Sequence, residues 1–409
     1  MTIRMDEGAA ELLDTLHRAG YAAYVVGGCV RDSLLGLTPH DWDLCTSALP
    51  QQVMELFGAQ RCIPTGLQHG TVTVKQSGAL YEITTFRTEG TYTDGRHPDE
   101  VHFVPDVRED LARRDLTINA MAYNEKEGLV DPFGGQADLQ SGIVRAVGVP
   151  RQRFTEDALR ILRLYRFAAR FGFAIDPPTA QAAQELCAHL DCVSVERIEE
   201  ELAKLLSAPA PAAYLDKKIL LVILPELSSE ELAAAKPVVD ACPAGTEDLP
   251  VRWAALLMSL GEDGTRKALK RLRCSNACIE QTAVLLREAS AAPGQAPAAH
   301  DTAIRIRKLL GRYDLHTVQR LAALGAAMEP ERAADFAAQA ELAAQLDADG
   351  VCCRVSQLAV NGRDLMAAGI PAGPGLRRTL EALLDAVIRG QLSNERQCLL
   401  DAAGQISAS

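Results

Sequence analysis

The stretch of sequence that most constrains the fold runs from residue 21 to residue 44. It begins with YAAYVV, an apolar run of strand length, which ends at Gly27-Gly28 directly before a segment with the pattern of a helix start. A glycine turn between a strand and a helix lets backbone N–H groups approach an anion closely, and the helix N-terminus favours negative charge. Arg31 follows in the first helical turn and adds a planar set of donors that suits phosphate. The segment therefore predicts an anion site at the end of a strand.

Two aspartates, Asp41 and Asp43, follow after Pro39. If they lie on a strand, their side chains point to the same face, which places two carboxylates side by side. Like charges at that distance repel, and divalent cations between them would relieve the repulsion. Two Mg²⁺ ions bridging the phosphates of a nucleotide suit oxygen ligands of this kind. A turn with two solvated acids is the alternative, but the order Gly-Gly, Arg-Asp, Asp-x-Asp favours a nucleotidyl-transfer site.

The sequence GGCVRDSLLG followed by HDWDL resembles the signature of the polymerase-β-like nucleotidyltransferases. It is similar to the branch that holds the poly(A) polymerases and the bacterial class II CCA-adding tRNA nucleotidyltransferases. The resemblance implies an α+β fold, with an N-terminal mixed-sheet head followed by an all-helical neck, body and tail. The expected boundaries are residues 1–145 for the catalytic head, 146–208 for the neck with a base-reading helix, 209–290 for the body and 291–409 for a tRNA-binding tail. A hydrophobic content of 48% with only 5% aromatic residues is typical of a largely helical chain.

Further motifs that resemble this family lie in the predicted head. Glu82 belongs to a strand-like run and would add a third catalytic carboxylate if that strand neighbours the aspartate pair; an acid on the solvent face of a sheet is the alternative. The segment RRDLTINA resembles the second family motif, in which Arg114 and Asp115 would hold the triphosphate and the ribose. The polar, turn-rich residues 91–98 resemble the flexible loop that the family needs to change from C to A addition.

Residues 151–170 form the second key stretch, in which Thr155 is expected to cap a helix with two acids at its positive end. Steps of three residues then place one acid and three arginines along a polar arc of this helix: Asp157, Arg160, Arg163 and Arg166. An amphipathic helix with a solvated basic side is the alternative. A carboxylate beside a guanidinium is complementary to the base edges of C and A, whereas U and G would leave the carboxylate facing an acceptor. EDALR matches the EDxxR motif with which the family reads CTP and ATP without a nucleic-acid template.

The predicted site thus combines residues from both stretches. The residues expected to bind nucleotide are Gly28, Arg31, Arg114, Asp115, Asp157, Arg160, Arg163 and Arg166, and the expected Mg²⁺ ligands are Asp41 and Asp43.

Charge is distributed unevenly along the chain. The net charge of −12 argues against a simple nucleic-acid binder, but residues 250–320 hold 12 basic and 6 acidic residues. Two clusters in this stretch are candidates for contact with the tRNA backbone, although basic faces are often only solvated. The candidate RNA-binding residues are Lys267, Lys270, Arg271, Arg305 and Arg307.

The sequence shows no signal for export or for a membrane span. Its start, MTIRMDEGAAELL, turns acidic at once, and no run of about 18 uncharged apolar residues follows anywhere. The 11 cysteines are scattered without the spacing of a zinc site, which favours reduced thiols and a cytoplasmic protein. The sequence leaves the oligomeric state open.

The predicted function is template-independent addition of CCA to the 3′ end of tRNA from CTP and ATP, with Mg²⁺ as cofactor and pyrophosphate as product. Poly(A) polymerase is the nearest alternative, but the segment TGLQHGTVTV resembles the CCA-adding enzymes instead. A CC-only adding enzyme is a second alternative. Such enzymes lack a complete flexible loop, whereas residues 91–98 look like a whole one. A catalytically inactive RNA-binding protein is a third, against which both carboxylates and the EDxxR pair are present.

Overall fold

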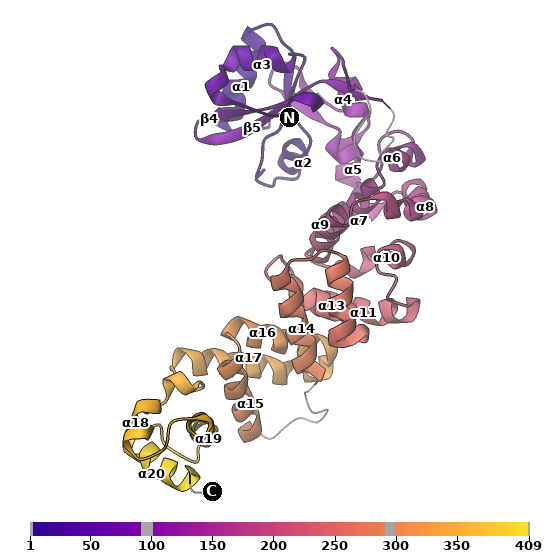
Figure 1. The fold of residues 1–409 in the computed structure, drawn as a ribbon. Helices are drawn as coiled ribbons and strands as arrows, with labels where there is room; N and C mark the ends of the chain where they lie inside the picture. Colours follow the sequence, from indigo (N-terminus) through magenta and orange to yellow (C-terminus); the bar gives the residue numbers. More distant parts are fainter. Residues whose placement is uncertain (1–2, 91–100, 291–298, 408–409) are drawn as a thin grey trace. The chain divides into compact units, whose positions relative to one another are not determined.

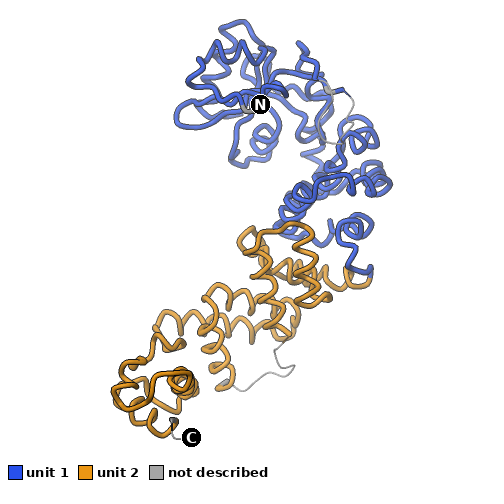
Figure 2. Tube along the Cα trace, viewed as in Figure 1, with its two compact units in different colours: residues 1–229 blue, residues 230–409 orange. Residues whose placement is uncertain are grey.

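The computed structural model describes residues 3–90, 101–290 and 299–407. The chain forms two compact units, Met1–Ser229 and Glu230–Ser409 (Figure 2). The finer division into head, neck, body and tail stays a prediction. Residues 91–98, which were predicted to form the flexible loop, lie outside the described residues.

Unit 1 begins with a seven-stranded mixed sheet. In spatial order its strands are β3 (Cys62–Gly66), β4 (Thr71–Gln76), β5 (Ala79–Thr85), β2 (Leu44–Thr46), β1 (Ala23–Val26), β8 (Ala122–Asn124) and β9 (Gly128–Val130). β2 and β5 run parallel, with Leu44 opposite Ile83, and the other neighbours in the sheet are antiparallel. The mixed-sheet head expected from the family resemblance is therefore confirmed.

Short strands and helices surround this sheet. Two further strand pairs are β6 (Arg87–Glu89) with β7 (Val101–Phe103) and β10 (Ile143–Val144) with β11 (Ala174–Ile175). The helices of this part are α1 (Glu7–Arg18), α2 (Gly28–Leu34), α3 (Pro50–Phe57), α4 (Val107–Ala112) and α5 (Gly135–Ser141). α1 and α3 pack on the sheet, with α1 against β1 and β2 and α3 against β4 and β5 (Figure 1).

β1 is a buried interior strand of the sheet, between β2 and β8. Each of its four residues is at most 4% exposed, as expected for a strand that is covered on both faces and reads as a continuous apolar run. At its end, the N–H of Val26 donates to the carbonyl of Asp43 at 2.9 Å, and the N–H of Gly27 donates to the carbonyl of Met121 at 3.0 Å. These bonds fix the position at which the chain leaves the sheet and enters α2.

The rest of unit 1 is helical. Its helices are α6 (Pro150–Glu156), α7 (Leu159–Phe171), α8 (Pro177–Leu186), α9 (Val195–Leu206) and α10 (Lys217–Ile223). Ten of the 13 residues of α7 are buried, and α9 packs along it with Ile198, Leu202 and Leu205 (Figure 1). α7 is therefore a central helix of this unit, packed on more than one side.

Within its described part, unit 2 consists of helices and their connections, which confirms the all-helical second part of the fold. Its α-helices are α11 (Ser229–Ala241), α12 (Leu249–Leu257), α13 (Gly261–Arg271), α14 (Asn276–Ser290), α15 (Ala299–Arg312), α16 (Leu315–Met328), α17 (Ala333–Ala348), α18 (Gly362–Ala367), α19 (Pro374–Ile388) and α20 (Arg396–Ser407). α16 and α17 approach closely because Gly325 has no side chain: a Cβ atom there would lie 2.4 Å from the ring of Phe336. Among the described residues, no helix combines the length and the apolar character needed to cross a membrane.

Candidate active site

The turn after β1 has the geometry that the sequence predicted. Gly27 has a φ of 78°, a value that L side chains rarely adopt. A Cβ atom at this position would also lie 2.9 Å from Nη1 of Arg114. The positive φ therefore favours glycine at position 27, and the close approach shows that Arg114 lies directly against the Gly-Gly turn.

Asp41 and Asp43 lie in the segment directly before β2, which begins at Leu44, so the condition that they lie on a strand is not met. The parallel pairing of β2 with β5 nevertheless brings Asp43 next to Glu82. Asp43 is classed as exposed by its accessible surface. Loss of hydration next to the surrounding protein and the charges of Glu82 and Asp41 raise its pKa, while Arg114 opposes them. Asp43 thus interacts with both of the other predicted catalytic carboxylates.

These carboxylates fit a divalent cation. Their oxygens are hard ligands, and a cation between them would relieve the repulsion that raises the pKa of Asp43. In the part of the chain that the structure describes, no three His, Cys, Asp or Glu side chains lie close enough to hold a metal ion by themselves. A cation bound by Asp41 and Asp43 would therefore take further ligands from water and phosphate oxygens, as Mg²⁺ usually does.

Arg31 is buried, with 4% of its surface exposed. Its Nε donates to Asp32 at 2.7 Å and its Nη1 donates to Asn119 at 2.5 Å. The guanidinium carbon lies 5.0 Å from the ring centroid of Phe167 and 5.2 Å from that of Phe171, both in α7. Arg31 therefore joins α2 to α7, and its predicted contact with phosphate stays a prediction.

One buried hydrogen-bond donor of Arg114 has no partner among the described residues. The Nη2 of Arg114 faces Asp110 at 3.5 Å, but its Nε is buried and has no hydrogen-bond partner among the described residues. A buried donor without a partner costs about 1–3 kcal/mol, and an anion bound at this position would remove that cost. The unpaired Nε beside the Gly-Gly turn fits the predicted role of Arg114 in holding phosphate.

Asp115 lies at the centre of a network of hydrogen bonds. Its Oδ2 accepts from Nε of Arg163 at 2.7 Å, and its Oδ1 accepts from Nδ2 of Asn119 at 3.2 Å. Burial by itself would raise the pKa of Asp115, but the charges of Arg163 and Arg160 and the hydrogen bonds from Arg163 and Asn119 hold it well below its usual value. Asp115 is therefore an ionised carboxylate that ties α7 to the head.

The EDALR segment lies at a break between two helices. α6 ends at Glu156, Asp157 has an extended backbone with φ −144° and ψ 107°, and α7 begins at Leu159. Thr155 lies inside α6, so the prediction that it caps the helix is wrong. Oδ1 of Asp157 instead accepts from the N–H of Leu159 at 3.0 Å and satisfies a donor at the start of α7.

Each charged residue of the predicted polar arc has its own oppositely charged partner. Asp157 accepts from Arg197 at 2.7 Å, Arg160 donates to Glu156 at 2.7 Å, Arg163 donates to Asp115 at 2.7 Å, and Arg166 donates to Glu201. Arg160 and Arg166 are each only 9% exposed, so the alternative of a solvated basic face is wrong. Burial lowers the pKa of Arg166, and the carboxylate of Glu201 opposes that effect.

Glu201 was not found from the sequence. It is 5% exposed, and besides its bond to Arg166 it lies 3.9 Å from Nη1 of Arg163. It belongs to three consecutive acids, which look like a solvated stretch of helix. Its spacing from Ile198 and Leu205 nevertheless places it on the apolar stripe of α9. This spacing is the sequence signal that could have predicted its burial.

Comparison with known proteins agrees with this geometry. Residues 23–145 match the family model described as "Poly A polymerase head domain", residues 172–230 match "Probable RNA and SrmB- binding site of polymerase A", and residues 247–403 match tRNA nucleotidyltransferase domain 2. The CCA-adding enzyme of Limosilactobacillus fermentum is 39% identical over 98% of this chain and 97% of its own length. This chain belongs to the CCA-adding enzyme family.

Solved structures of the family share the fold. The crystal structure of the Bacillus stearothermophilus CCA-adding enzyme in complex with CTP matches with a TM-score of 0.80 at 33% identity, over 98% of both chains. The Thermotoga maritima CCA-adding enzyme complexed with tRNA_CCA has a TM-score of 0.70 at 21% identity, over 98% of this chain and 96% of its own. Membership in the family confirms a nucleotidyltransferase enzyme and implies dependence on a divalent metal.

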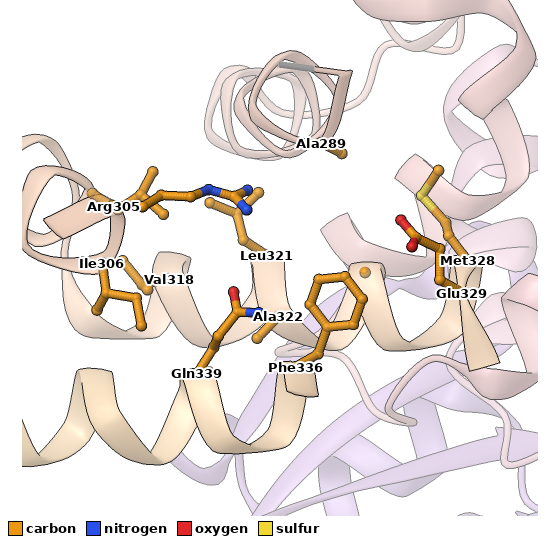
Figure 3. A pocket seen from close by; sticks show the side chains of 12 residues that line it. Ala289, Arg305, Ile306, Val318, Leu321, Ala322, Met328, Glu329, Phe336 and Gln339 are labelled. Atoms are coloured by element: carbon orange, nitrogen blue, oxygen red, sulfur yellow. The ribbon is translucent and has the colours of Figure 1, made fainter. Parts of the chain in front are cut away.

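The residues predicted to bind RNA fall into two different environments in this family member. Lys267, Lys270 and Arg271 are exposed on α13, and the two lysines make no ion pair with any described residue. Arg305 is only partly exposed and lines a cavity of about 50 Å³ among α14, α15, α16 and α17 (Figure 3). Arg307 donates to the carbonyl of Ile388 at 3.2 Å. Their contact with RNA stays a prediction, and α13 offers the more accessible surface.

Replacing Glu201 with Gln is expected to destabilise unit 1, because the buried guanidinium of Arg166 would lose its carboxylate partner. The expected loss in the free energy of unfolding is about 3 kcal/mol. Glu200→Gln is the matched control, since Glu200 pairs with Lys204 on the exposed side of the same helix, and it should cost at most about 1 kcal/mol. Denaturant unfolding of both variants gives the comparison, and equal stabilities would contradict the importance of the buried pair.

Proposed function

We propose that this chain adds CCA to the 3′ end of tRNA without a nucleic-acid template, using CTP and ATP and releasing pyrophosphate. The bond between Arg163 and Asp115 supports this most directly. It joins the motif predicted to hold the triphosphate and ribose to α7, the helix in which the EDxxR motif ends, although the two residues are 48 positions apart in sequence. One nucleotide could therefore be held by both motifs at once. Full-length relatives with the name CCA-adding enzyme support the same conclusion.

Asp157 and Arg160 would select the base. Arg160 is held by Glu156 and by the carbonyl of Arg113, to which its Nη2 donates at 3.1 Å. Asp157 is held by Arg197 and by the start of α7. Both side chains thus have fixed positions, and a carboxylate acceptor beside a guanidinium donor matches the amine and ring nitrogen of C and of A. U and G present a carbonyl oxygen where the amine should be, so they would be rejected at a cost of about 1–3 kcal/mol.

Asp41 and Asp43, with Glu82 beside them, would hold Mg²⁺ close to the phosphates of the nucleotide. The unpaired Nε of Arg114 would donate a hydrogen bond to the same phosphates. Mg²⁺ bound there would help to activate the tRNA 3′-hydroxyl and to neutralise the charge of the departing pyrophosphate.

All 11 cysteines are free, which supports the reducing cytoplasm as the place of this reaction.

The function is tested with purified protein, a tRNA that ends before CCA, Mg²⁺ and each labelled nucleotide in turn. CTP should be incorporated first, and ATP only after two C residues have been added. Repeated addition of A would indicate a poly(A) polymerase, and a stop after two C residues would indicate a CC-only enzyme. Absence of any incorporation would contradict the proposal.

Asp41→Ala or Asp43→Ala should abolish addition of both C and A, because the metal would lose a ligand, while tRNA binding should remain close to that of the wild type. Binding is measured by gel shift and the chemical step by single-turnover incorporation. More than a small residual rate in either variant would refute the assignment of that aspartate as a metal ligand.

Arg160→Ala should reduce the preference for CTP over UTP by about 1–3 kcal/mol, because the variant has no donors to the base edge. Single-turnover incorporation of CTP, ATP, UTP and GTP measures this preference. Arg170→Ala is the matched control, since it removes a partly exposed guanidinium from the other end of α7, and it should leave the preference unchanged. If Arg160 only held the triphosphate, all four nucleotides would suffer alike and the preference would persist.

Lys267→Glu with Lys270→Glu should weaken tRNA binding and flatten its dependence on salt. Each tRNA phosphate that the variant no longer neutralises should lower the log–log slope by about 0.9. Lys75→Glu with Lys126→Glu in the head is the matched control, with the same change of charge at two exposed lysines. Filter binding over a range of salt concentrations measures both slopes. An unchanged slope in the α13 variant would show that this face is only solvated.

A further inference from the structure

Phe167 is a point at which three of the predicted nucleotide-binding arginines meet. The guanidinium carbon of Arg166 lies 3.9 Å from its ring centroid, that of Arg31 lies at 5.0 Å, and that of Arg163 lies at 5.6 Å. Among the described residues, no other ring has three guanidinium groups within such distances. The ring itself is 5% exposed, so these contacts are shielded from water.

The three guanidinium groups come from different places in the fold. Arg31 belongs to α2 in the head, whereas Arg163 and Arg166 belong to α7. Each one also pairs with a carboxylate: Arg31 with its neighbour Asp32 on α2, Arg163 with Asp115 and Arg166 with Glu201 on α9. Glu201 also lies 3.9 Å from Nη1 of Arg163, so it approaches two of the three arginines, whereas the ring of Phe167 is the contact that all three share.

Packing of apolar surface does not by itself explain this arrangement. Three cations around one group repel one another, and a purely aliphatic side chain would do nothing to offset that repulsion. The face of an aromatic ring carries partial negative charge, and each cation over it gains about 0.5–2 kcal/mol, with the larger values where water is excluded. A ring at position 167 therefore allows three guanidinium groups to converge where a Leu would not.

We propose that Phe167 is a positioning residue, which holds Arg31, Arg163 and Arg166 around one aromatic ring so that they act together on the triphosphate of the incoming nucleotide. This role rests on the proposed function for the identity of the nucleotide. The ring does not touch the substrate and acts only through the three arginines. It should affect CTP and ATP equally, because they share the triphosphate, and it should not affect the choice of base, which belongs to Asp157 and Arg160.

The test replaces Phe167 with phenylalanines that carry one, two and three fluorine atoms. Fluorine withdraws electron density from the face of the ring and scarcely changes its shape, so folding should be preserved where Phe167→Leu could leave a cavity. The KM values for CTP and ATP should rise stepwise and together, to about tenfold with three fluorines, which corresponds to about 1.4 kcal/mol. The kcat values and the preference for CTP over UTP should stay close to those of the wild type.

The same series at Phe154 is the matched control. Phe154 is 1% exposed in the adjoining helix α6, and no described guanidinium lies over its ring. Its KM values should stay flat. A flat series at position 167, with an active wild-type enzyme, would overturn the role of Phe167 while leaving the proposed function intact.

A wild-type protein that incorporates neither C nor A would refute the proposed function instead. The role of Phe167 is then decided by titration calorimetry of the same variants with inorganic tripolyphosphate. A Kd that rises with fluorination at position 167 but not at 154 supports the positioning role, and a constant Kd refutes it.

Discussion

The ion pair between Arg163 and Asp115 is the contact on which the rest of the site depends. Asp115 is 9% exposed, and its bond to Nε of Arg163, whose side chain is 35% exposed, is 2.7 Å long. The buried carboxylate depends on this guanidinium, because an uncompensated buried charge costs several kcal/mol. The pair fixes α7 against the head at the level of the nucleotide-binding motifs. The break before α7, at Asp157, then determines where the side chains that are proposed to read the base lie.

The burial of α7 shows how a helix rich in arginine can pack inside a protein. Its charged residues are matched by carboxylates from several segments, including Asp32 on α2, Asp115 after α4 and Glu201 on α9. Since these partners belong to different elements, the network specifies the relative position of those elements as well as neutralising charge. Arg114 is different, because its buried Nε lacks a partner among the described residues. A nucleotide would therefore meet a preorganised set of donors, and little reorganisation would be needed when it binds.

The sequence predicted the features that depend on local rules. The apolar run at β1 and the glycine with positive φ at position 27 follow from short-range periodicity and backbone sterics. One local prediction was wrong, and features that depend on residues distant in sequence were missed. Thr155 looked like a helix cap because acids follow it, but α6 had already begun at Pro150. The burial of Arg31 against two rings of α7 could not be predicted from residues 21–44 alone, since those rings lie more than 130 residues away.

The charged residues predicted to bind nucleotide and those predicted to bind RNA differ in how far they are exposed to solvent. Every residue predicted to bind nucleotide lies in unit 1, and the four of the arc and Asp115 are held by bonds that are at least partly buried. Screening by salt acts weakly on such pairs. The lysines of α13 lie in unit 2 and are exposed, so any contact that they make with phosphate is open to competition from salt ions. If Asp157 and Arg160 read the base as proposed, the binding of tRNA would vary with ionic conditions while the choice between C and U would not, because the side chains that select the base are held by partly buried bonds.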